Sequence, residues 1–512
     1  MKKLLLLFNT IKFLKPIQVY YRFYYVVRKR VRKFTGFHYP LSMVSRAIYL
    51  ELAPSIPSPV SVENRTFTFL NLSYTFEEEG IEWNFSEYGK LWTYNLTYFD
   101  FLHQEEMCKE KGLGLIHDFI DKMETHQDAL EPFPISLRGI NWIKFLTRHQ
   151  IREPKIDDSL YAQYSMLVDN LEYHLLGNHL LENGFSLLFG AYYFQDEVLY
   201  ANAVEILQKE LKEQILQDGG HFELSPMYHQ LMLFRVLDCI NLLKNNTWKK
   251  EALLELFVSK AEIMLGWLGN ISYQNGDIPL FNDSANYIAP TTEALSQYAK
   301  GLHLSSQAVN LYASGYRKIV KEKYESVIDI GSIGAKYIPG HAHADTFNFE
   351  LRINGKPFIV DSGLSTYETN QKRFYERSTK AHNTVEVSEE NSSEVWGSFR
   401  VANRAEIIEL KEEENCIEAT HDGYKDRGIL HTRCWCFEEN LMRIEDRLSQ
   451  RGKAVFRLHF HPAVSKKEIE EKIKYDDFCL GTYAYAQAFN KTEKAYVLEI
   501  AFEKNLKVEI EI

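Results

Sequence analysis

The chain has 512 residues, 45% hydrophobic and 25% charged, a composition typical of a globular protein with two or three domains. Residues 1–50 contain 11 Lys or Arg and no acidic residue. Because the whole chain has a net charge of −11, residues 51–512 have a net charge of −22. An acidic body of this kind excludes a general nucleic-acid-binding protein, and an anionic polysaccharide would need a locally basic site.

The first 34 residues are basic and aromatic. The apolar run Leu4–Phe8 is short for a signal-peptide core and no small-residue cleavage site follows it, which by itself indicates a cytoplasmic protein. No stretch of the chain is long enough to span a membrane. Residues 1–34 could make a peripheral contact with an anionic membrane surface. The simpler alternative is a solvated basic helix that packs on the rest of the protein.

The spacing of apolar residues divides the remaining chain. Residues 1–80 end in a linker interrupted by prolines. In residues 81–320 apolar side chains recur every three or four positions, as at Phe234 and Leu237, which is typical of helices. In residues 321–512 the spacing changes to two, which is typical of strands. A run of helices followed by a run of strands predicts an α+β multidomain protein with a helical domain before an all-β domain.

A first polar motif lies in the segment that ends at Trp142. Arg138, Asn141 and Trp142 share one face of the expected helix because they lie three and four residues apart. One interpretation is an arginine paired with an acid beside a core tryptophan. The alternative is a wall of a substrate cleft.

Two further motifs follow in the helical domain. Gly177 is expected to end a helix, so that Asn178 and His179 lie at its C-terminal edge, where alone they would be a cap and a surface histidine. Downstream, a proline suits the first turn of another helix, so Tyr228 and His229 lie near a helix start, where the dipole favours a nearby anion. A lone Tyr-His pair is usually structural.

The densest group of polar residues lies between positions 341 and 384. On a strand, His341, His343 and Asp345 would continue an apolar stripe, so we expect them to be partly buried and to need partners. Imidazole and carboxylate together indicate a metal or catalytic site rather than a polar core patch, with ligands drawn from His341, His343, Asp361 and His382. An Asn-Gly hairpin would place Asp361 opposite Asn348 instead of His343, so a metal site needs a bend or bulge.

These segments resemble the heparinase II/III-like polysaccharide lyases. The resemblance is carried by His-Ala-His-Ala-Asp from His341, Ile-Val-Asp-Ser-Gly from Ile359 and Arg-Ser-Thr-Lys-Ala-His-Asn-Thr from Arg377, and it covers roughly residues 80–460. It implies an incomplete (α/α) toroid over 81–320 and an antiparallel β-sandwich over 321–512. It also implies β-elimination on a uronic-acid-containing polysaccharide, without an organic cofactor.

The resemblance assigns roles to residues as well. Elimination removes the C5 proton of a uronate, which is weakly acidic until the adjacent carboxylate is neutralised by hydrogen-bond donors. Asn178 and His179 would hold this carboxylate, Tyr228 would transfer protons, and His341 would be the base when the C5 proton lies on the other face. A structural zinc would be held by His343, Asp361 and His382. The substrate-binding candidates are Arg138, Asn141, Trp142, Glu223, His229 and Arg377.

Two other functions remain open at this point. An α/α-toroid glycoside hydrolase needs two carboxylates flanking the scissile bond, and Glu223 and Asp283 are the obvious pair. A non-catalytic polysaccharide-binding protein of an envelope or export system is the third hypothesis. The motifs do not distinguish among uronate polysaccharides or between cleavage modes, and they leave the oligomeric state open. The resemblance favours the cell envelope or periplasm, in contrast to the cytoplasmic indication of the N-terminus.

Overall fold

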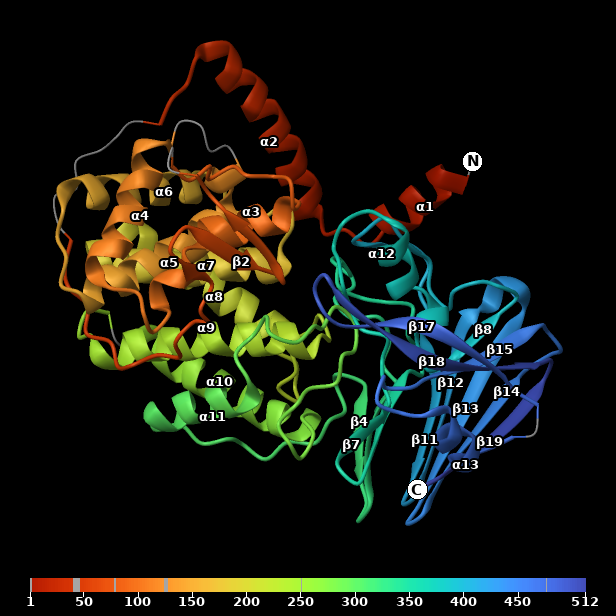
Figure 1. Ribbon diagram of the computed structural model, residues 1–512. Helices are drawn as coiled ribbons and strands as arrows, with labels where there is room; N and C mark the ends of the chain where they lie inside the picture. Colours follow the sequence, from red (N-terminus) through yellow and green to blue (C-terminus); the bar gives the residue numbers. More distant parts are fainter. Residues whose placement is uncertain (1, 40–46, 78–79, 124–127, 250, 476) are drawn as a thin grey trace.

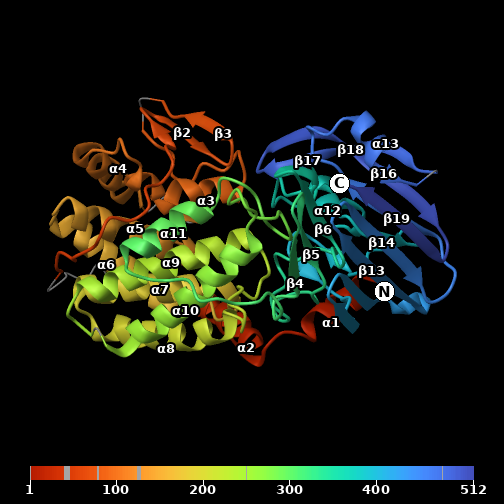
Figure 2. The same ribbon diagram turned by 90° about the horizontal axis from the view of Figure 1, so that it is seen from below.

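The computed structural model describes residues 2–39, 47–77, 80–123, 128–249, 251–475 and 477–512. Two lobes lie side by side, one of helices and one of strands (Figures 1 and 2). The helices from α3 to α11 fall within residues 90–301, and the strands from β4 onward fall within residues 316–511. The change in apolar spacing near residue 320 therefore coincides with the boundary between the lobes.

A helical arm precedes both lobes. Helices α1 (Lys2–Ile11) and α2 (Pro16–Thr35) lie on the same side of the molecule, α1 beside the strand lobe and α2 beside the helical lobe (Figures 1 and 2). Gly36 ends α2 with φ +62, a left-handed conformation that glycine adopts without strain. A small sheet of β1 (Val62–Glu63), β2 (Thr66–Phe69) and β3 (Leu72–Thr75) follows.

The helical lobe is built around α7. All residues of α7 except His179 are buried, as expected for a helix that is apolar on every side and packs against α5, α8 and α9. The helices of this lobe are α3 (Lys90–Tyr98), α4 (Lys109–Asp121), α5 (Pro132–Arg148), α6 (Pro154–Asp169), α7 (Gly177–Phe194), α8 (Glu197–Gln214), α9 (Pro226–Asn245), α10 (Glu251–Ile271) and α11 (Thr292–Gly301).

The strand lobe contains antiparallel sheets around a second apolar core. Burial alternates residue by residue along β13, so one face of its sheet packs on the core and the other faces solvent. The first sheet orders β4 (Tyr316–Val320), β5 (Tyr324–Asp329), β6 (Phe349–Ile353) and β7 (Lys356–Ile359). The largest orders β11 (Ile407–Glu413), β12 (Cys416–Tyr424), β13 (Ile429–Glu438), β14 (Leu441–Leu448), β19 (Asn505–Glu511) and β16 (Ile473–Lys474). The third orders β17 (Cys479–Ala488), β18 (Lys491–Phe502), β15 (Ala454–His459) and β8 (Val385–Val387).

Short elements complete this lobe. Helix α12 (Gln371–Glu376) and the pair β9 (Val395–Trp396) and β10 (Arg400–Val401) lie between the first sheet and the others in the sequence, and α13 (Lys466–Lys472) precedes β16. Arg373 on α12 bonds Asp283, in the segment before α11, and Trp396 on β9 bonds Thr10 of the arm.

The expected hairpin at Asn354-Gly355 is present, but the strand before it is shorter than expected. Residues 341–348 form a loop, β6 begins only at Phe349, and Phe347 has φ +72, which no strand residue adopts. Polar side chains of this loop bond to several different segments, and a straight strand could not reach all of them.

One disulfide links two neighbouring strands of the largest sheet. Cys416 on β12 bonds Cys436 on β13, and the two residues are directly paired across these strands. The register of a long hairpin brings them together, and nothing in the spacing of the cysteines indicates that register.

Candidate active site

Tyr228 and His341 meet at the junction of the two lobes. Tyr228 lies in the first turn of α9, where Ser225 caps the helix by accepting the backbone N–H of Tyr228 at 3.2 Å. The rings of Tyr228 and His341 have centroids 4.0 Å apart, and the Tyr228 hydroxyl lies 3.1 Å from that of Tyr367. Two motifs from different lobes therefore share one site.

Asp283 connects the two histidines of the loop. Its carboxylate is fully buried and lies 2.9 Å from Nδ1 of His341 and 2.8 Å from Nε2 of His343. Arg373 on α12 donates two hydrogen bonds to the same carboxylate, one of them at 2.7 Å. Burial alone would raise the pKa of Asp283, but Arg373 and the two histidines hold it well below its usual range.

This arrangement orients His341. Asp283 bonds Nδ1 of His341, which leaves Nε2 of His341 facing the junction. There Nε2 lies 3.7 Å from Glu223 Oε2. Sequence analysis treated Asp283 only as half of a hydrolase pair and assigned no role to Arg373. Their convergence depends on chain segments whose packing no local pattern reveals.

The beginning of α7 forms the opposite side of the site. Gly177 has φ +61 and begins this helix instead of ending one, so Asn178 and His179 lie at its N-terminus, contrary to the expected C-terminal edge. The Asn178 N–H donates to Glu223 Oε1 at 3.3 Å. The positive end of the helix dipole favours an anion here.

His179 is a cation candidate at this helix end. Its Nδ1 lies 2.9 Å from Glu172 Oε1, and its ring contacts Phe133. Burial alone would lower the pKa of His179, but the Glu172 carboxylate raises it above the ordinary value. The imidazolium form is therefore favoured next to the buried Glu223.

Burial dominates the titration of the two central groups. It raises the pKa of Glu223, against the opposing effects of His341 and the Asn178 N–H, and among the described residues the Glu223 Oε2 atom has no hydrogen-bond partner. It also raises the pKa of Tyr228, although Tyr367 and Arg373 act in the opposite direction. The environment therefore favours the neutral phenol of Tyr228 over the phenolate form that could accept a proton.

Four predicted substrate-binding residues are not brought to this site. Arg138 is fully buried and donates to Gln163, Thr97 O and Ala129 O, and Trp142 packs in the aromatic core of the helical lobe. The other two are fixed by equally specific bonds. Asn141 donates to Tyr98 O and Asp100, and both ring nitrogens of His229 are used, by Met264 O and the His221 N–H.

Arg377 lies behind the site. It is fully buried and donates from Nε and Nη2 to Ala342 O at 3.2 and 2.8 Å, and from Nη1 to Gly397 O. Because Ala342 separates His341 from His343, Arg377 supports the histidine loop and does not face a substrate.

The proposed metal ligands lie beside Asp283. The rings of His343 and His382 have centroids 5.3 Å apart, and both side chains are fully buried. Within the residues that the structure describes, His343 Nδ1, His382 Nε2 and Asp345 Oδ2 have no hydrogen-bond partner. Asp361 accepts from His382 Nδ1 at 2.8 Å and from Asn348 at 2.5 Å, the neighbour expected from the hairpin.

The donor set therefore fits a divalent cation chemically, with two unused imidazole nitrogens and two carboxylates. In the residues that the structure describes, no three such groups are already arranged as a metal centre. The unused oxygen of Asp345 was not among the expected ligands.

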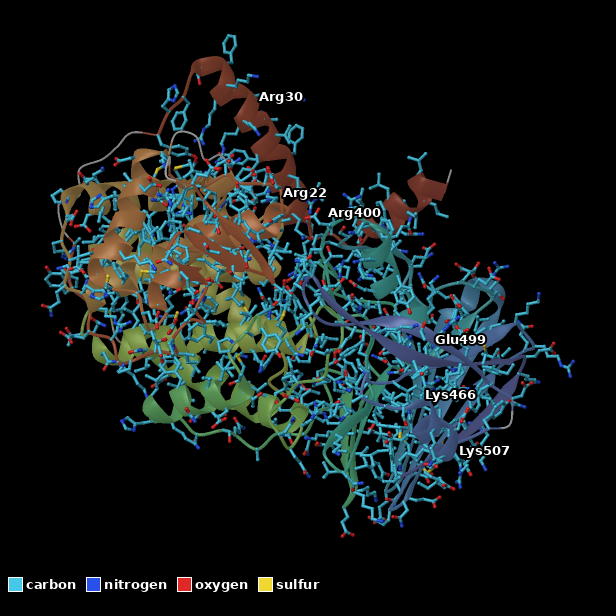
Figure 3. The ribbon with its side chains drawn as sticks, viewed as in Figure 1. Arg22, Arg30, Arg400, Lys466, Glu499 and Lys507 are labelled. Atoms are coloured by element: carbon cyan, nitrogen blue, oxygen red, sulfur yellow. A yellow bond between two sulfur atoms is a disulfide. The ribbon has the colours of Figure 1, made fainter. Side chains whose placement is uncertain are left out.

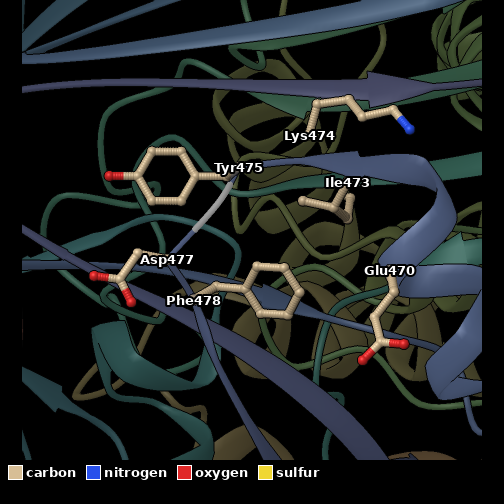
Figure 4. A pocket seen from close by; sticks show the side chains of 6 residues that line it. All are labelled: Glu470, Ile473, Lys474, Tyr475, Asp477 and Phe478. Atoms are coloured by element: carbon tan, nitrogen blue, oxygen red, sulfur yellow. The ribbon is translucent and has the colours of Figure 1, made fainter.

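A separate surface hollow lies between α13 and the strands after it. It is lined by Glu470, Ile473, Lys474, Tyr475, Asp477 and Phe478. The charged ends of Glu470, Lys474 and Asp477 point away from one another (Figure 4). They do not converge on a point where a ligand could react, so the junction remains the candidate active site.

Comparison with known proteins identifies the family. A profile described as "Heparinase II/III N-terminus" matches residues 156–309, and one described as "Heparinase II/III-like, C-terminal" matches residues 305–500. The chain belongs to the heparinase II/III family. Together the two matches run from residue 156 to residue 500 and include Asn178, Tyr228 and His341.

Similar proteins include two heparin-sulfate lyases. That of Bacteroides stercoris is 25% identical over 247 residues, covering 43% of this chain and 37% of the relative. The lyase of Pedobacter heparinus is 26% identical over 259 residues, covering 44% of this chain and 39% of the relative. These alignments therefore span about two fifths of each relative.

Solved structures establish the fold class. The crystal structure of heparinase III matches with a TM-score of 0.65 at 16% identity, covering 86% of this chain and 80% of that one. Heparan sulfate lyase HepC from Pedobacter heparinus matches with a TM-score of 0.51 at 17% identity, covering 87% of this chain and 80% of that one. The expected helical toroid followed by an antiparallel β-sandwich is thus confirmed.

Proposed function

We propose that this protein is a polysaccharide lyase that cleaves a uronic-acid-containing polysaccharide by β-elimination. The observation that carries the proposal is the contact between Tyr228 and His341 beside the N-terminus of α7. A phenol and an imidazole at one point, next to donors for a carboxylate, are the groups that this reaction needs. The family supports the same reaction class.

The uronate carboxylate would bind where α7 begins. The His179 imidazolium and the Asn178 side-chain amide can both donate to it, beside the positive end of the helix dipole. Glu223 accepts the Asn178 N–H, and burial raises the pKa of Glu223, so it is protonated more readily beside a substrate carboxylate. Neutralising the carboxylate makes the C5 proton more acidic.

Proton transfer would use the two rings of the site. His341 Nε2 is suited to accept the C5 proton, because Asp283 on Nδ1 stabilises the resulting imidazolium. The Tyr228 hydroxyl, kept as a phenol by burial, is suited to protonate the leaving C4 oxygen. Where both groups lie on one side of the ring, Tyr228 would serve as base and acid in turn, with Tyr367 and Arg373 stabilising the phenolate.

An anionic polysaccharide is the proposed partner. Figure 3 shows Arg22 on α2 and Arg400 on β10 near each other at the gap between the lobes, and burial together with Arg400 lowers the pKa of Arg22. Phe399, next to Arg400, contacts the His341 ring. Two neighbouring cations beside the site provide the local basic surface that the acidic body otherwise lacks.

A structural zinc held by His343, Asp361 and His382 is part of the proposal. When bound, it would brace the histidine loop, while His341 and Tyr228 perform the chemistry. Elemental analysis should find one zinc per chain, and His343→Ala should lose the metal and lower the midpoint of thermal unfolding. Protein without metal whose midpoint is unchanged by His343→Ala would contradict the zinc site.

A glycoside hydrolase is less well supported by the geometry. Asp283 is fully buried and already bonded to Arg373, His341 and His343. It is therefore unavailable as the second carboxylate that hydrolysis requires.

The test is a panel of uronate polysaccharides followed by ultraviolet absorbance. Elimination leaves a conjugated double bond in the product, so absorbance should rise with at least one substrate, and Tyr228→Phe should abolish most of the increase. New reducing ends without absorbance would identify a hydrolase. Binding without either signal would identify a polysaccharide-binding protein.

A further inference from the structure

One face of α2 accounts for its attachment to the helical lobe. Gln18 donates to Leu175 O at 2.9 Å, Tyr21 stacks on Tyr173 with centroids 4.8 Å apart, and Tyr25 donates to Leu171 O. Further along, Arg28 and Arg32 form ion pairs with Asp169. These positions recur every three or four residues, so together they form the inner face of the helix.

The opposite face of α2 is apolar and exposed. Phe23 is 73% exposed and Phe34 is 93% exposed, on a helix whose inner face is fully engaged. Residues of this outer stripe again recur at helical spacing, which is the pattern of an amphipathic helix whose apolar side has no protein covering among the described residues. The exposed apolar residues of α2 are Val19, Tyr20, Phe23, Tyr24, Val26, Val27, Val31 and Phe34.

Helix α1 repeats this arrangement. Asn9 is buried and Thr10 bonds Trp396 of the strand lobe, whereas Leu4 is 72% exposed and Phe8 and Ile11 also face solvent. Both views place α1 and α2 on the same side of the molecule (Figures 1 and 2). The two exposed stripes can therefore meet one extended surface.

Basic side chains flank the apolar stripe. Lys29, Arg30 and Lys33 are exposed, Arg30 extending from the outer part of α2 (Figure 3), and no acidic residue occurs before Glu51. Pairing of two copies of α2 about a two-fold axis would bring these like charges together. A soluble anionic polysaccharide would satisfy the charges but would leave the phenylalanines and valines in water.

We propose that α1 and α2 form an arm that binds the surface of a membrane containing anionic lipids. The apolar stripes would enter the boundary between headgroups and acyl chains, tyrosines would lie at the headgroups, and the flanking Lys and Arg would contact lipid phosphates. No described helix is long and apolar enough to cross a bilayer, so the arm lies in the surface plane. This binding is independent of the proposed lyase activity.

The attachment of α2 gives the binding a consequence for the site. Helix α2 contacts residues 169–175, which lead directly into the start of α7 with Asn178 and His179. A protein docked through the arm would therefore hold its candidate active site at a set orientation to the membrane. Polysaccharide present at that surface would be its nearest substrate.

The experiment is flotation of the full chain with vesicles of phosphatidylglycerol and phosphatidylcholine, compared with vesicles of phosphatidylcholine alone. The protein should bind the anionic vesicles and bind the neutral ones much more weakly. Raising the salt from about 0.1 M to about 1 M should weaken binding, because the Debye length falls from about 10 to about 3 Å.

Matched double variants test the apolar contact and the charge contact with the membrane separately. Phe23→Glu with Phe34→Glu should weaken vesicle binding at least about tenfold, because two large apolar side chains are replaced by negative charges that anionic lipids repel. The control is Val198→Glu with Tyr287→Glu, which replaces exposed apolar residues outside the arm. Lys29→Glu with Lys33→Glu should also weaken binding, and Lys466→Glu with Lys467→Glu on α13 should not.

All substituted side chains are exposed, so thermal unfolding should remain as in the wild type. The proposal is overturned if the wild type fails to float with anionic vesicles, or if the two phenylalanine changes weaken binding no more than their control. It is also overturned if the protein is a dimer in analytical ultracentrifugation, the phenylalanine changes dissociate it, and vesicles do not bind. In that case a second copy covers the stripe.

Discussion

The protein contains two buried networks of histidine, aspartate and arginine, and they differ in what is left unpaired. In the strand lobe, His421 Nε2 donates to His431 Nδ1 at 3.0 Å, and His431 Nε2 donates to Asp446 at 2.6 Å. Arg433 closes this network with two bonds to Asp446. The other ring nitrogen of His421, Nδ1, accepts a hydrogen bond from the Gly423 N–H.

The network at the junction has the same residue types, but some of its neighbouring polar atoms make no hydrogen bond among the described residues. Asp283 binds Arg373, His341 and His343, as Asp446 binds Arg433 and His431. Around it, Glu223 Oε2 and His343 Nδ1 are buried without a hydrogen-bond partner in the described part of the chain. Burial and charge pairing are thus common to both networks, and unused donors and acceptors mark the one that can bind a ligand.

The largest expected effect concerns Tyr228, at the open network. Tyr228→Phe removes only the hydroxyl, so turnover should fall by about 10² to 10⁴, the usual contribution of a positioned acid or base, with little change in stability. Tyr192→Phe is the matched control, because the Tyr192 hydroxyl is buried in the same lobe without a partner. Turnover per folded molecule near that of the wild type would exclude Tyr228 from the chemistry.

Asp446→Asn tests whether the closed network is structural. Breaking a buried ion pair leaves Arg433 uncompensated and should lower the free energy of unfolding by about 3–5 kcal/mol in denaturant titrations. The exposed pair of Glu503 with Arg451 gives the control Glu503→Gln, which should be nearly neutral. A strong loss of turnover in Asp446→Asn at unchanged stability would remove the distinction between the networks.

Asp283→Asn should have a smaller effect on turnover than Tyr228→Phe but a more specific one. Loss of the carboxylate removes the acceptor that orients His341 and the charge that stabilises its imidazolium, so turnover should fall about 10- to 10³-fold. The pH profile of turnover should shift as well, which a purely structural defect would not produce. Asp277→Asn, at a half-exposed carboxylate bonded to Arg352, is the control.

The smallest expected effect is the loss of unfolding free energy when acid protonates His421 in the closed network. Burial, His431 and Arg433 lower the pKa of His421 well below its ordinary value of 6.5. A depressed pKa contributes stability that is present above 6.5 and is lost as the pH falls, by up to about 2–3 kcal/mol at about pH 4.5. Unfolding free energies at the two pH values should therefore differ less in His421→Asn than in the wild type. Equal differences would exclude His421.

Much of the architecture follows from local patterns. The change in apolar spacing from three or four to two places the boundary between helices and strands, because each period buries one face of its own kind of element. Ser225 and Pro226 begin α9 as their chemistry requires, and Asn354-Gly355 turns the hairpin. The sequence motifs alone also sufficed to identify the family.

Other features depend on contacts between distant segments. Gly177 begins a helix because the segment before it turns against α2 and α7, whereas a glycine alone is equally suited to end one. Arg138 and Trp142 fit a cleft wall by their spacing, but the packing of the helical lobe buries them in its core. Helical spacing indicates which residues share a face, and only packing decides what that face meets.

The candidate site shows the same division most clearly. His341, His343 and Tyr228 could be selected from the sequence because their residue types suit proton transfer and metal binding. Asp283 and Arg373 became recognisable only in the folded protein, where one carboxylate accepts bonds from both histidines and the arginine. Short-range geometry is encoded by neighbouring residues, whereas a buried charge network requires that chain segments far apart in the sequence pack together and exclude water.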